Sequence, residues 1–227
     1  MHELSDKEII TSWELNAAPW NEAIENQRIE SRRLLTNQAI IDAIMDQKPS
    51  SFWDLGCGEG WLSREIGFQG IKTLGTDVIS DLLEIARRKD PSGSYELLAY
   101  EDLDSFSPDQ SFEVICCNFS LIGKESVDHI FTHIPSFLSE GGKFIVQTLH
   151  PETACGDEAY VDGWRKGSWA GFSEDFCRPA PWYFRTLDSW KKLYRGNGFE
   201  LSDIREPIHP KTGLPASVIF VGERGST

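Results

Sequence analysis

Short apolar segments alternate with amphipathic segments through the middle of the chain, and this pattern predicts a parallel β-sheet. The candidate strands are residues 52–55, 71–76, 94–98, 112–117 and 143–148. Amphipathic stretches between them predict helices at residues 59–67, 79–89 and 125–139, although Pro135 should kink or break the last one. Strands that alternate with helices of this length are typical of βαβ units. We therefore expect an α/β fold with helices on both faces of the sheet.

The two ends of the chain and one internal stretch depart from this alternation. Residues 6–48 show mostly helical spacing, and residues 150–183 are rich in Gly, Trp, Tyr, Phe and Pro without a clear period. The alternation then returns, with a helix over 187–195 and strands over 199–204 and 217–221. We expect one domain over 1–227 with four parts, namely a helical cap (1–48), a core (50–149), an insertion or lid (150–183) and a last helix with two strands (184–227).

Charge and composition narrow the classes of partner. Lys and Arg number 22 against 36 Asp and Glu, a formal net charge of −14 that disfavours nucleic acid and anionic membranes. The sequence has no apolar run of about 18 residues, and its first residues lack the layout of a signal peptide. The five cysteines include no CxxC pair. These features favour a cytoplasmic protein with reduced thiols and no metal site.

A glycine-rich loop, FWDLGCGEGW at residues 52–61, follows the first predicted strand. A dinucleotide loop needs a third glycine where this chain has Trp61, and Glu59 would meet the pyrophosphate with negative charge. A phosphate loop of the GxxxxGK[ST] type is also excluded, because no Gly-Lys-Ser or Gly-Lys-Thr follows. Asp77 lies 21 residues after Gly56, which alone fits several kinds of nucleotide enzyme.

The segment WDLGCGEGWLS resembles the first motif of class I S-adenosylmethionine-dependent methyltransferases. The resemblance implies that the loop passes the methionyl part of the cofactor, with Asp54 near its amino group. It places in the cofactor site the loop residues Gly56, Cys57, Gly58, Glu59 and Gly60. The segment LGTDVIS is similar to the end of the family's second strand, where Asp77 would accept hydrogen bonds from the ribose hydroxyls and Val78 would follow.

Later segments continue the resemblance in order. LLAYEDLDSFSPDQSFEVICCNFSLIG is similar to the family's adenine segment, and it implies adenine contacts from Tyr100, Glu101 and Asp102. Ala99 stands where the family has an acidic residue, so either Glu101 or Asp102 would read the exocyclic amine. Asn118 and Phe119 would lie near the sulfonium. FLSEGGKFIVQTLHP resembles the fifth strand with its Gly-Gly turn, so the likeness covers residues 50–150.

Aromatic residues of the cap and the insertion are the candidates for covering the cofactor and for binding the acceptor. Trp20 is the candidate cover, and the candidate acceptor wall is Tyr160, Trp164, Trp182 and Tyr183. The alternative is that these rings form the small core of a lid. His150, directly after the fifth strand, is either a general base or a structural residue that ends the strand. Arg32 or Arg33 could reach the cofactor carboxylate.

These observations lead to one expectation and its rivals. We expect a class I methyltransferase fold, Rossmann-like, with a seven-stranded, mostly parallel sheet whose last strand is antiparallel. The implied function is methyl transfer from S-adenosylmethionine to an oxygen or nitrogen atom of a small molecule. The alternatives are a non-catalytic S-adenosylmethionine-binding sensor, a nicotinamide-dependent dehydrogenase, and methylation of a macromolecule. The sequence predicts no oligomeric state.

Overall fold

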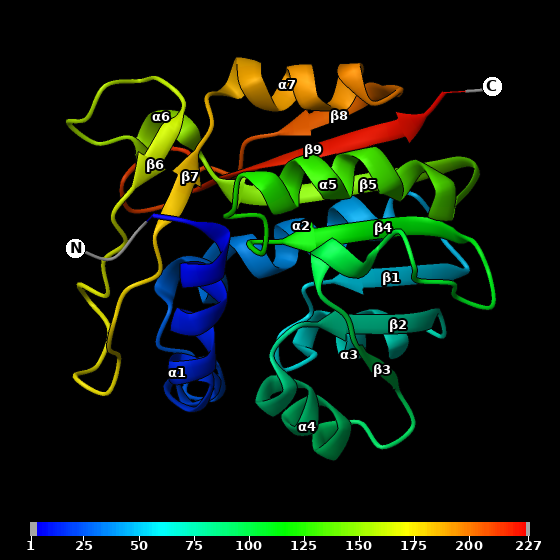
Figure 1. Ribbon diagram of the computed structural model, residues 1–227, viewed down its shortest axis with the longest axis horizontal. Helices are drawn as coiled ribbons and strands as arrows, with labels where there is room; N and C mark the ends of the chain where they lie inside the picture. The colour runs from blue at the N-terminus through cyan, green and yellow to red at the C-terminus, as the bar shows by residue number, and fades with distance from the viewer. Residues whose placement is uncertain (1–3, 226–227) are drawn as a thin grey trace.

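The computed structural model describes residues 4–225, which form a seven-stranded sheet in the order β3-β2-β1-β4-β5-β9-β8 (Figure 1). Its strands are β1 (Ser51–Leu55), β2 (Lys72–Asp77), β3 (Ser94–Leu97), β4 (Phe112–Asn118), β5 (Leu138–Leu149), β8 (Phe199–Arg205) and β9 (Ser217–Arg224). Strands β1 to β5 pair in parallel, whereas β9 runs antiparallel to both β5 and β8. The expected mostly parallel sheet with an antiparallel last strand is confirmed.

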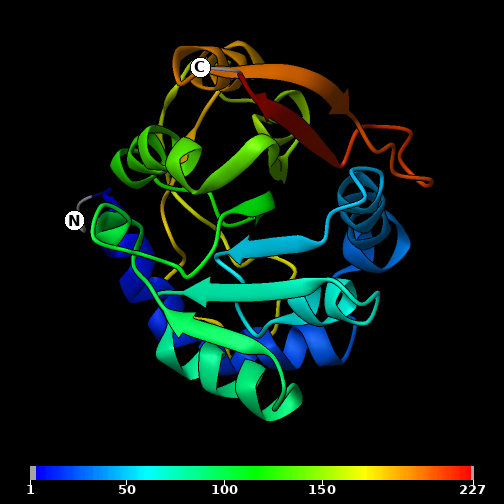
Figure 2. The same ribbon diagram turned by 90° about the vertical axis from the view of Figure 1, so that its right-hand side faces the viewer.

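Helices cover both faces of the sheet (Figures 1 and 2). On one face, α5 (Glu125–His133) and α7 (Leu187–Gly196) pack on a large apolar cluster that includes Trp53. On the other, α2 (Asn37–Met45) and α3 (Trp61–Gly67) pack on a second cluster that includes Phe52. Neighbouring strand residues point to opposite faces, so the fully buried β1 contributes to both clusters.

Pro135 determines how α5 ends. The helix stops at His133, and a 3₁₀ turn over Ile134–Phe137 leads directly into β5. Proline has no N–H to donate and clashes with the preceding turn of an α-helix, so the expected break occurs. β5 consequently begins at Leu138, earlier than the predicted strand at 143–148, and the predicted helix over 125–139 is too long.

The N-terminal helices have two different roles. α1 (Asp6–Glu25) lies beside the carboxyl ends of the strands (Figure 1). A π-helical turn (Arg32–Thr36) then leads into α2, whose Ile40 and Ile44 are fully buried against the sheet. Only α1 therefore acts as a cap, and α2 belongs to the layer of helices that covers the sheet.

The insertion contains a small sheet of its own. After α6 (Pro151–Ala154), strand β6 (Gly163–Arg165) pairs antiparallel with β7 (Trp182–Phe184). The stretch that joins them contacts α1, because Cys177 and Arg178 accept hydrogen bonds from α1 side chains. Among the helices of residues 4–225, none has the length and apolar character that crossing a membrane requires.

Helix α4 (Ser80–Lys89), which follows β2 in the chain, packs on β2, β3 and α1.

Candidate active site

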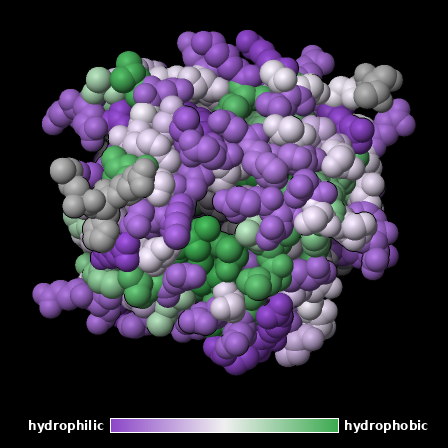
Figure 3. Space-filling view, in the orientation of Figure 1, coloured by the Kyte–Doolittle hydropathy of each residue, from purple (hydrophilic) through white to green (hydrophobic). Residues whose placement is uncertain are grey.

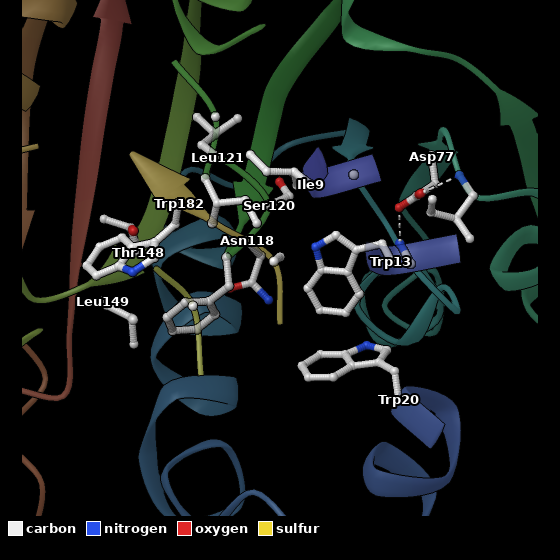
Figure 4. Close-up of a pocket in the computed structure, with 18 of the residues that line it drawn as sticks. Ile9, Trp13, Trp20, Asp77, Asn118, Ser120, Leu121, Thr148, Leu149 and Trp182 are labelled. Atoms are coloured by element: carbon white, nitrogen blue, oxygen red, sulfur yellow. Dashed lines mark hydrogen bonds between the residues drawn. The ribbon is translucent and has the colours of Figure 1, made fainter. Parts of the chain in front are cut away.

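A cavity of about 480 Å³ lies at the carboxyl edge of the sheet, between the strand ends, α1 and the insertion (Figure 4). Figure 3 shows a mostly hydrophilic face on which hydrophobic residues gather beside a hollow near α1. Strand order explains this location. The chain passes from β1 to β2 on one side, whereas β4 lies on the other side of β1, so the connections after β1 and β4 diverge and leave a crevice. Crevices at such switch points are the usual ligand sites of open α/β sheets.

The three glycines of the loop after β1 serve different purposes. A Cβ at Gly56 would overlap Tyr100 and Ser120, and one at Gly60 would lie 2.9 Å from the Cβ of Ala86. Both glycines therefore allow close packing within the protein. Gly58 has φ +57° and no atom within 4 Å of its Cβ position, so it leaves an open face toward a ligand. Gly60 does not line the cavity, whereas Gly56, Cys57, Gly58 and Glu59 do.

Two carboxylates, the half-buried Asp77 and the buried Asp54, line the same half of the cavity. Asp77 at the end of β2 accepts hydrogen bonds from the backbone N–H groups of Gly58 and Ile79, both at 2.8 Å, one on each oxygen. Each oxygen keeps a second lone pair for a ligand hydroxyl. Asp54 accepts a 2.9 Å hydrogen bond from Ser63 Oγ, and burial raises the pKa of Asp54 to about 7. Burial likewise raises the pKa of Asp77.

Arg32 in the π-helical turn brings a positive charge to the same end of the cavity. Its Nε donates to Asn37 Oδ1 at 3.1 Å, while Nη2 is buried and has no hydrogen-bond partner among the described residues. The guanidinium lies 4.9 Å from the ring centroid of Trp61 and 5.8 Å from that of Trp20. Burial lowers the pKa of Arg32 to about 10. A guanidinium beside the cavity whose buried Nη2 has no partner within residues 4–225 fits an anionic ligand group.

The predicted adenine residues lie on a 3₁₀ turn after β3 (Tyr100–Asp102). Tyr100 and Glu101 line the cavity together with Val78, whereas Asp102 does not. Of the two acidic residues considered for the adenine amine, only Glu101 faces the cavity. Trp20 also lines it, with its ring edge-to-face against Trp13 at 5.0 Å between centroids.

The candidate acceptor residues divide into two groups. Trp182 and Tyr183, on β7, line the cavity beside Leu121 and Ile122, which follow β4, and Tyr183 N–H donates to Ile122 O at 2.8 Å. Tyr160 and Trp164 lie outside that lining. Tyr160 packs edge-to-face on Phe184 at 5.6 Å, and Trp164 packs on Tyr183, also at 5.6 Å. Both rings thus pack against residues of β7 outside the cavity, and Tyr160 remains 40% exposed.

The side chain of His150 contacts Glu206 and does not reach the cavity. The ring is 2% exposed, its Nε2 lies 3.1 Å from Glu206 Oε1, and its Nδ1 has no partner among the described residues. Its neighbours Leu149 and Pro151 line the cavity, but His150 does not. The geometry therefore does not bring the imidazole to the place where an acceptor would lie.

Asn118 and Phe119, at the end of β4, line the cavity between its two halves. Phe119 has φ +55°, a left-handed conformation that a phenylalanine rarely adopts, and its N–H donates to Gln147 O at 2.8 Å. Figure 4 shows Asn118 between Trp13 and Asp77 on one side and Thr148 and Trp182 on the other.

The insertion closes over the cavity by binding to α1. The carboxamide of Asn16 accepts from Cys177 N–H at 2.9 Å and donates to Cys177 O at 2.8 Å. Ser12 Oγ donates to Arg178 O at 2.6 Å, and both Ser12 and Asn16 are fully buried. Trp169 of the insertion packs against Trp13 at 5.8 Å.

Several cavity residues were not among those predicted from the sequence. Ile9 and Trp13 lie on α1 with the predicted Trp20, at successive intervals of four and seven residues, so the three share one helical face. This spacing is visible in the sequence and could have identified that face. Leu121, Ile122 and Trp190 carry no comparable signal, because only the fold brings them to the cavity.

Comparison with known proteins gives a consistent result. A family model described as a methyltransferase domain matches residues 28–204. A ubiquinone biosynthesis O-methyltransferase of Xylella fastidiosa (strain M23) is 30% identical over 161 residues, which are 66% of this chain and 61% of that protein. An uncharacterized methyltransferase of Alkaliphilus oremlandii (strain OhILAs) is 27% identical over 54% of this chain and 56% of its own. The chain thus spans less than two thirds of the length of these curated relatives.

Solved structures share the fold. The PH0226 protein from Pyrococcus horikoshii OT3 superposes with a TM-score of 0.64 at 16% identity, covering 88% of this chain and 91% of that one. A putative S-adenosylmethionine-dependent methyltransferase from Listeria monocytogenes superposes with a TM-score of 0.62 at 22% identity, covering 78% and 92%. Three observations indicate the same family. They are the strand order, the glycine loop beside Asp77, and the match of the family model over most of the chain. The chain belongs to the class I S-adenosylmethionine-dependent methyltransferase family.

Proposed function

We propose that this protein transfers a methyl group from S-adenosylmethionine to an oxygen or nitrogen atom of a small molecule. The observation that carries the proposal is the continuity of the cavity. One space joins the acidic glycine-loop half to an aromatic half lined by Trp182 and Tyr183. A methyl donor and an acceptor can therefore meet inside the protein.

The residues of the first half fit the cofactor group by group. Asp77 keeps a free lone pair on each oxygen for the two ribose hydroxyls. Asp54 is buried and no cation of residues 4–225 is bonded to it, so it suits an ammonium group. The unpartnered Nη2 of Arg32 suits the carboxylate of the same amino-acid moiety. Gly58 leaves open space where a side chain would block a ligand.

The protein contributes to the reaction by orientation and by excluding water. The bound cofactor supplies an electrophilic methyl group on a sulfonium. Trp13 and Trp20 from α1, with Trp169 from the insertion, cover the cavity, and the hydrogen bonds of Asn16 hold the two covers together. A largely apolar wall helps to align an acceptor for in-line displacement and reduces the water that would solvate it.

The surface charge supports a small acceptor rather than a polyanion. With a formal net charge of −14, the protein would repel a nucleic acid backbone, and the cover over the cavity leaves little room for a folded partner. Cys57, Cys116 and Cys117 are free and buried, which supports a cytoplasmic location.

Calorimetry with S-adenosylhomocysteine tests the cofactor assignment. Asp77→Ala removes two charge-assisted hydrogen bonds and should weaken binding about 100-fold or more. The matched control, Asp81→Ala, alters an exposed carboxylate on α4 and should leave binding unchanged. Equal affinity in both variants would contradict the assignment.

A second measurement separates an enzyme from a sensor. Mass spectrometry of a reaction with S-adenosylmethionine and a mixed pool of small amines, phenols and carboxylic acids should detect S-adenosylhomocysteine and a product heavier by one methylene. Tight binding of S-adenosylhomocysteine without its formation from any acceptor would favour a non-catalytic binding protein.

A further inference from the structure

Asp6 lies at the opposite end of α1 from Arg32, the residue proposed to hold the cofactor carboxylate. It is the first residue of the helix, whereas Trp20, whose ring lies 5.8 Å from the Arg32 guanidinium, is near the other end. A rise of 1.5 Å per residue separates Asp6 from Trp20 by about 21 Å along the axis. Ile9 and Trp13 continue the cavity lining between them. Asp6 is therefore remote from the place proposed for the methionyl group.

The Asp6 carboxylate is fixed against the start of α5. Its Oδ1 accepts from Lys124 N–H at 2.8 Å, and its Oδ2 accepts from Ser126 N–H at 2.6 Å. A Cβ at Gly123 would lie 2.7 Å from Asp6 Oδ2, so the glycine allows this close approach. Each carboxylate oxygen keeps a second lone pair for another donor. Asp6 is thus a positioned hydrogen-bond acceptor whose capacity is only half used.

The segment that holds Asp6 also binds β7, which carries the aromatic half of the cavity. Tyr183 N–H donates to Ile122 O at 2.8 Å, and Arg185 Nη1 donates to Gly123 O at 2.7 Å. Asp6, Tyr183 and Arg185 all line the cavity. Asp6 therefore belongs to the half in which the acceptor is proposed to bind.

This half of the cavity has a negative charge that no cation of residues 4–225 neutralises. The charged residues in the described lining are Asp6, Arg32, Asp54, Glu59, Asp77, Glu101 and Arg185. All but the first and the last belong to the cofactor half. Arg185 lies 3.5 Å from Asp128, whereas Asp6 contacts only the two N–H groups. The N-terminus of α5 supplies about half a positive charge, so the surroundings of Asp6 remain negative.

A cationic acceptor group fits this end of the cavity better than an anionic one. Arg185 is buried and already donates to backbone carbonyl oxygens, so it offers little to an anion. Trp182 lines the same half and presents a ring suited to a cation–π contact. The formal net charge of −14 also attracts cations toward the protein.

From this arrangement we propose that Asp6 anchors a protonated amino group of the acceptor, distinct from the atom that is methylated. This inference rests on the proposed function. The ammonium donates to the free lone pairs of Asp6, and the reacting oxygen or nitrogen extends from there toward the cofactor half. The separation keeps the ammonium away from the positive sulfur of the cofactor, because like charges repel. The acceptor class is therefore small amines that carry a second nucleophilic group.

Calorimetry with three probes of one shape tests the inference without knowledge of the acceptor. Protein saturated with S-adenosylhomocysteine is titrated with benzylammonium, benzyl alcohol and benzoate, which are positive, neutral and negative. The wild type should bind benzylammonium about tenfold or more tightly than benzyl alcohol, and benzoate more weakly than either. Asp6→Asn should abolish the preference for benzylammonium and change benzyl alcohol affinity less than about threefold.

Glu125→Gln is the matched control. It removes the same charge from an exposed carboxylate of the neighbouring segment, which does not line the cavity. Its preference for benzylammonium should equal that of the wild type, and an equal loss there would overturn the inference, because attraction by the surface would then be the cause. Should Asp6→Asn fail to fold, Asp6→Ser retains an oxygen for one N–H and gives the second variant.

The outcomes separate the two levels of the argument. If the wild type does not bind S-adenosylhomocysteine, the proposed function and the inference both fail. If S-adenosylhomocysteine binds but benzylammonium shows no preference over benzyl alcohol or no binding, the inference alone fails. A preference that persists in Asp6→Asn beside a lowered melting temperature would also overturn it, because Asp6 would then serve only to cap α5.

Discussion

Asn16→Ala should release the central part of the insertion from α1. Asn16 is fully buried and forms two hydrogen bonds with the backbone of Cys177. After the change, Cys177 O still accepts from Trp169 Nε1 at 2.9 Å, whereas Cys177 N–H loses its acceptor. One orphaned donor and one lost hydrogen bond together cost about 2–3 kcal/mol. This is equivalent to an open state about 30 to 150 times more populated.

Native-state hydrogen exchange measures that opening directly. The amide of Cys177 should exchange about 30 to 150 times faster in Asn16→Ala, because local opening governs its protection. Amides of α7, which packs on the far cluster, should keep their rates. The control Glu14→Ala changes an exposed residue of the same helix and should leave Cys177 protected. An unchanged Cys177 rate, or equal acceleration in α7, would refute the idea of a local connection between cap and insertion.

Five other substitutions test the site. Burial raises the pKa of Asp54 from 3.8 to about 7, so the native state retains a proton between about pH 4 and pH 7 that the unfolded chain releases. The free energy of unfolding should therefore fall by up to about 4 kcal/mol as the pH rises from about 4 to about 7. Denaturant curves of Asp54→Asn should lack this pH dependence. Gly58→Ala should cost about 1–2 kcal/mol of stability but weaken S-adenosylhomocysteine binding, whereas Gly56→Ala should lower the melting temperature far more, because its Cβ would overlap protein atoms. Arg32→Leu should weaken S-adenosylhomocysteine about 10- to 100-fold in calorimetry and leave 5′-methylthioadenosine, which lacks the carboxylate, unaffected. His150→Ala should lower the melting temperature and spare turnover; lost turnover at unchanged stability would restore the general-base hypothesis.

The sequence predicted the sheet well because its strands are buried on both faces. Runs such as FWDL and FEVICC are apolar at nearly every position, and the glycines and polar stretches between them mark the connections. Pro135 correctly indicated where α5 ends. The cofactor half followed from one loop and one aspartate, since both lie directly after strands and strand ends meet at one edge of the sheet.

The structure of the insertion and the orientations of Gly60 and His150 depend on contacts between distant parts of the chain, which the sequence does not show. Strands β6 and β7 have three residues each, too short for a period of two to be visible. Gly60 looked equivalent to Gly58, and only the packing of Ala86 and Tyr95 shows that it faces inward. His150 follows a strand as a catalytic residue would, yet its side chain turns toward Glu206.

The order of synthesis gives α1 an unusual position in the folding of this chain. It is synthesised well before its partners, because Asp6 contacts Ser126 across a separation of 120 residues and Asn16 contacts Cys177 across 161. Until then, Trp13 and Trp20 have none of their insertion partners. Contacts of such long range form late, because the loop-closure entropy must first be overcome. Nascent chains released before residue 177 should therefore expose this tryptophan face to chaperones, and only a chain that already includes the insertion can enclose the cavity.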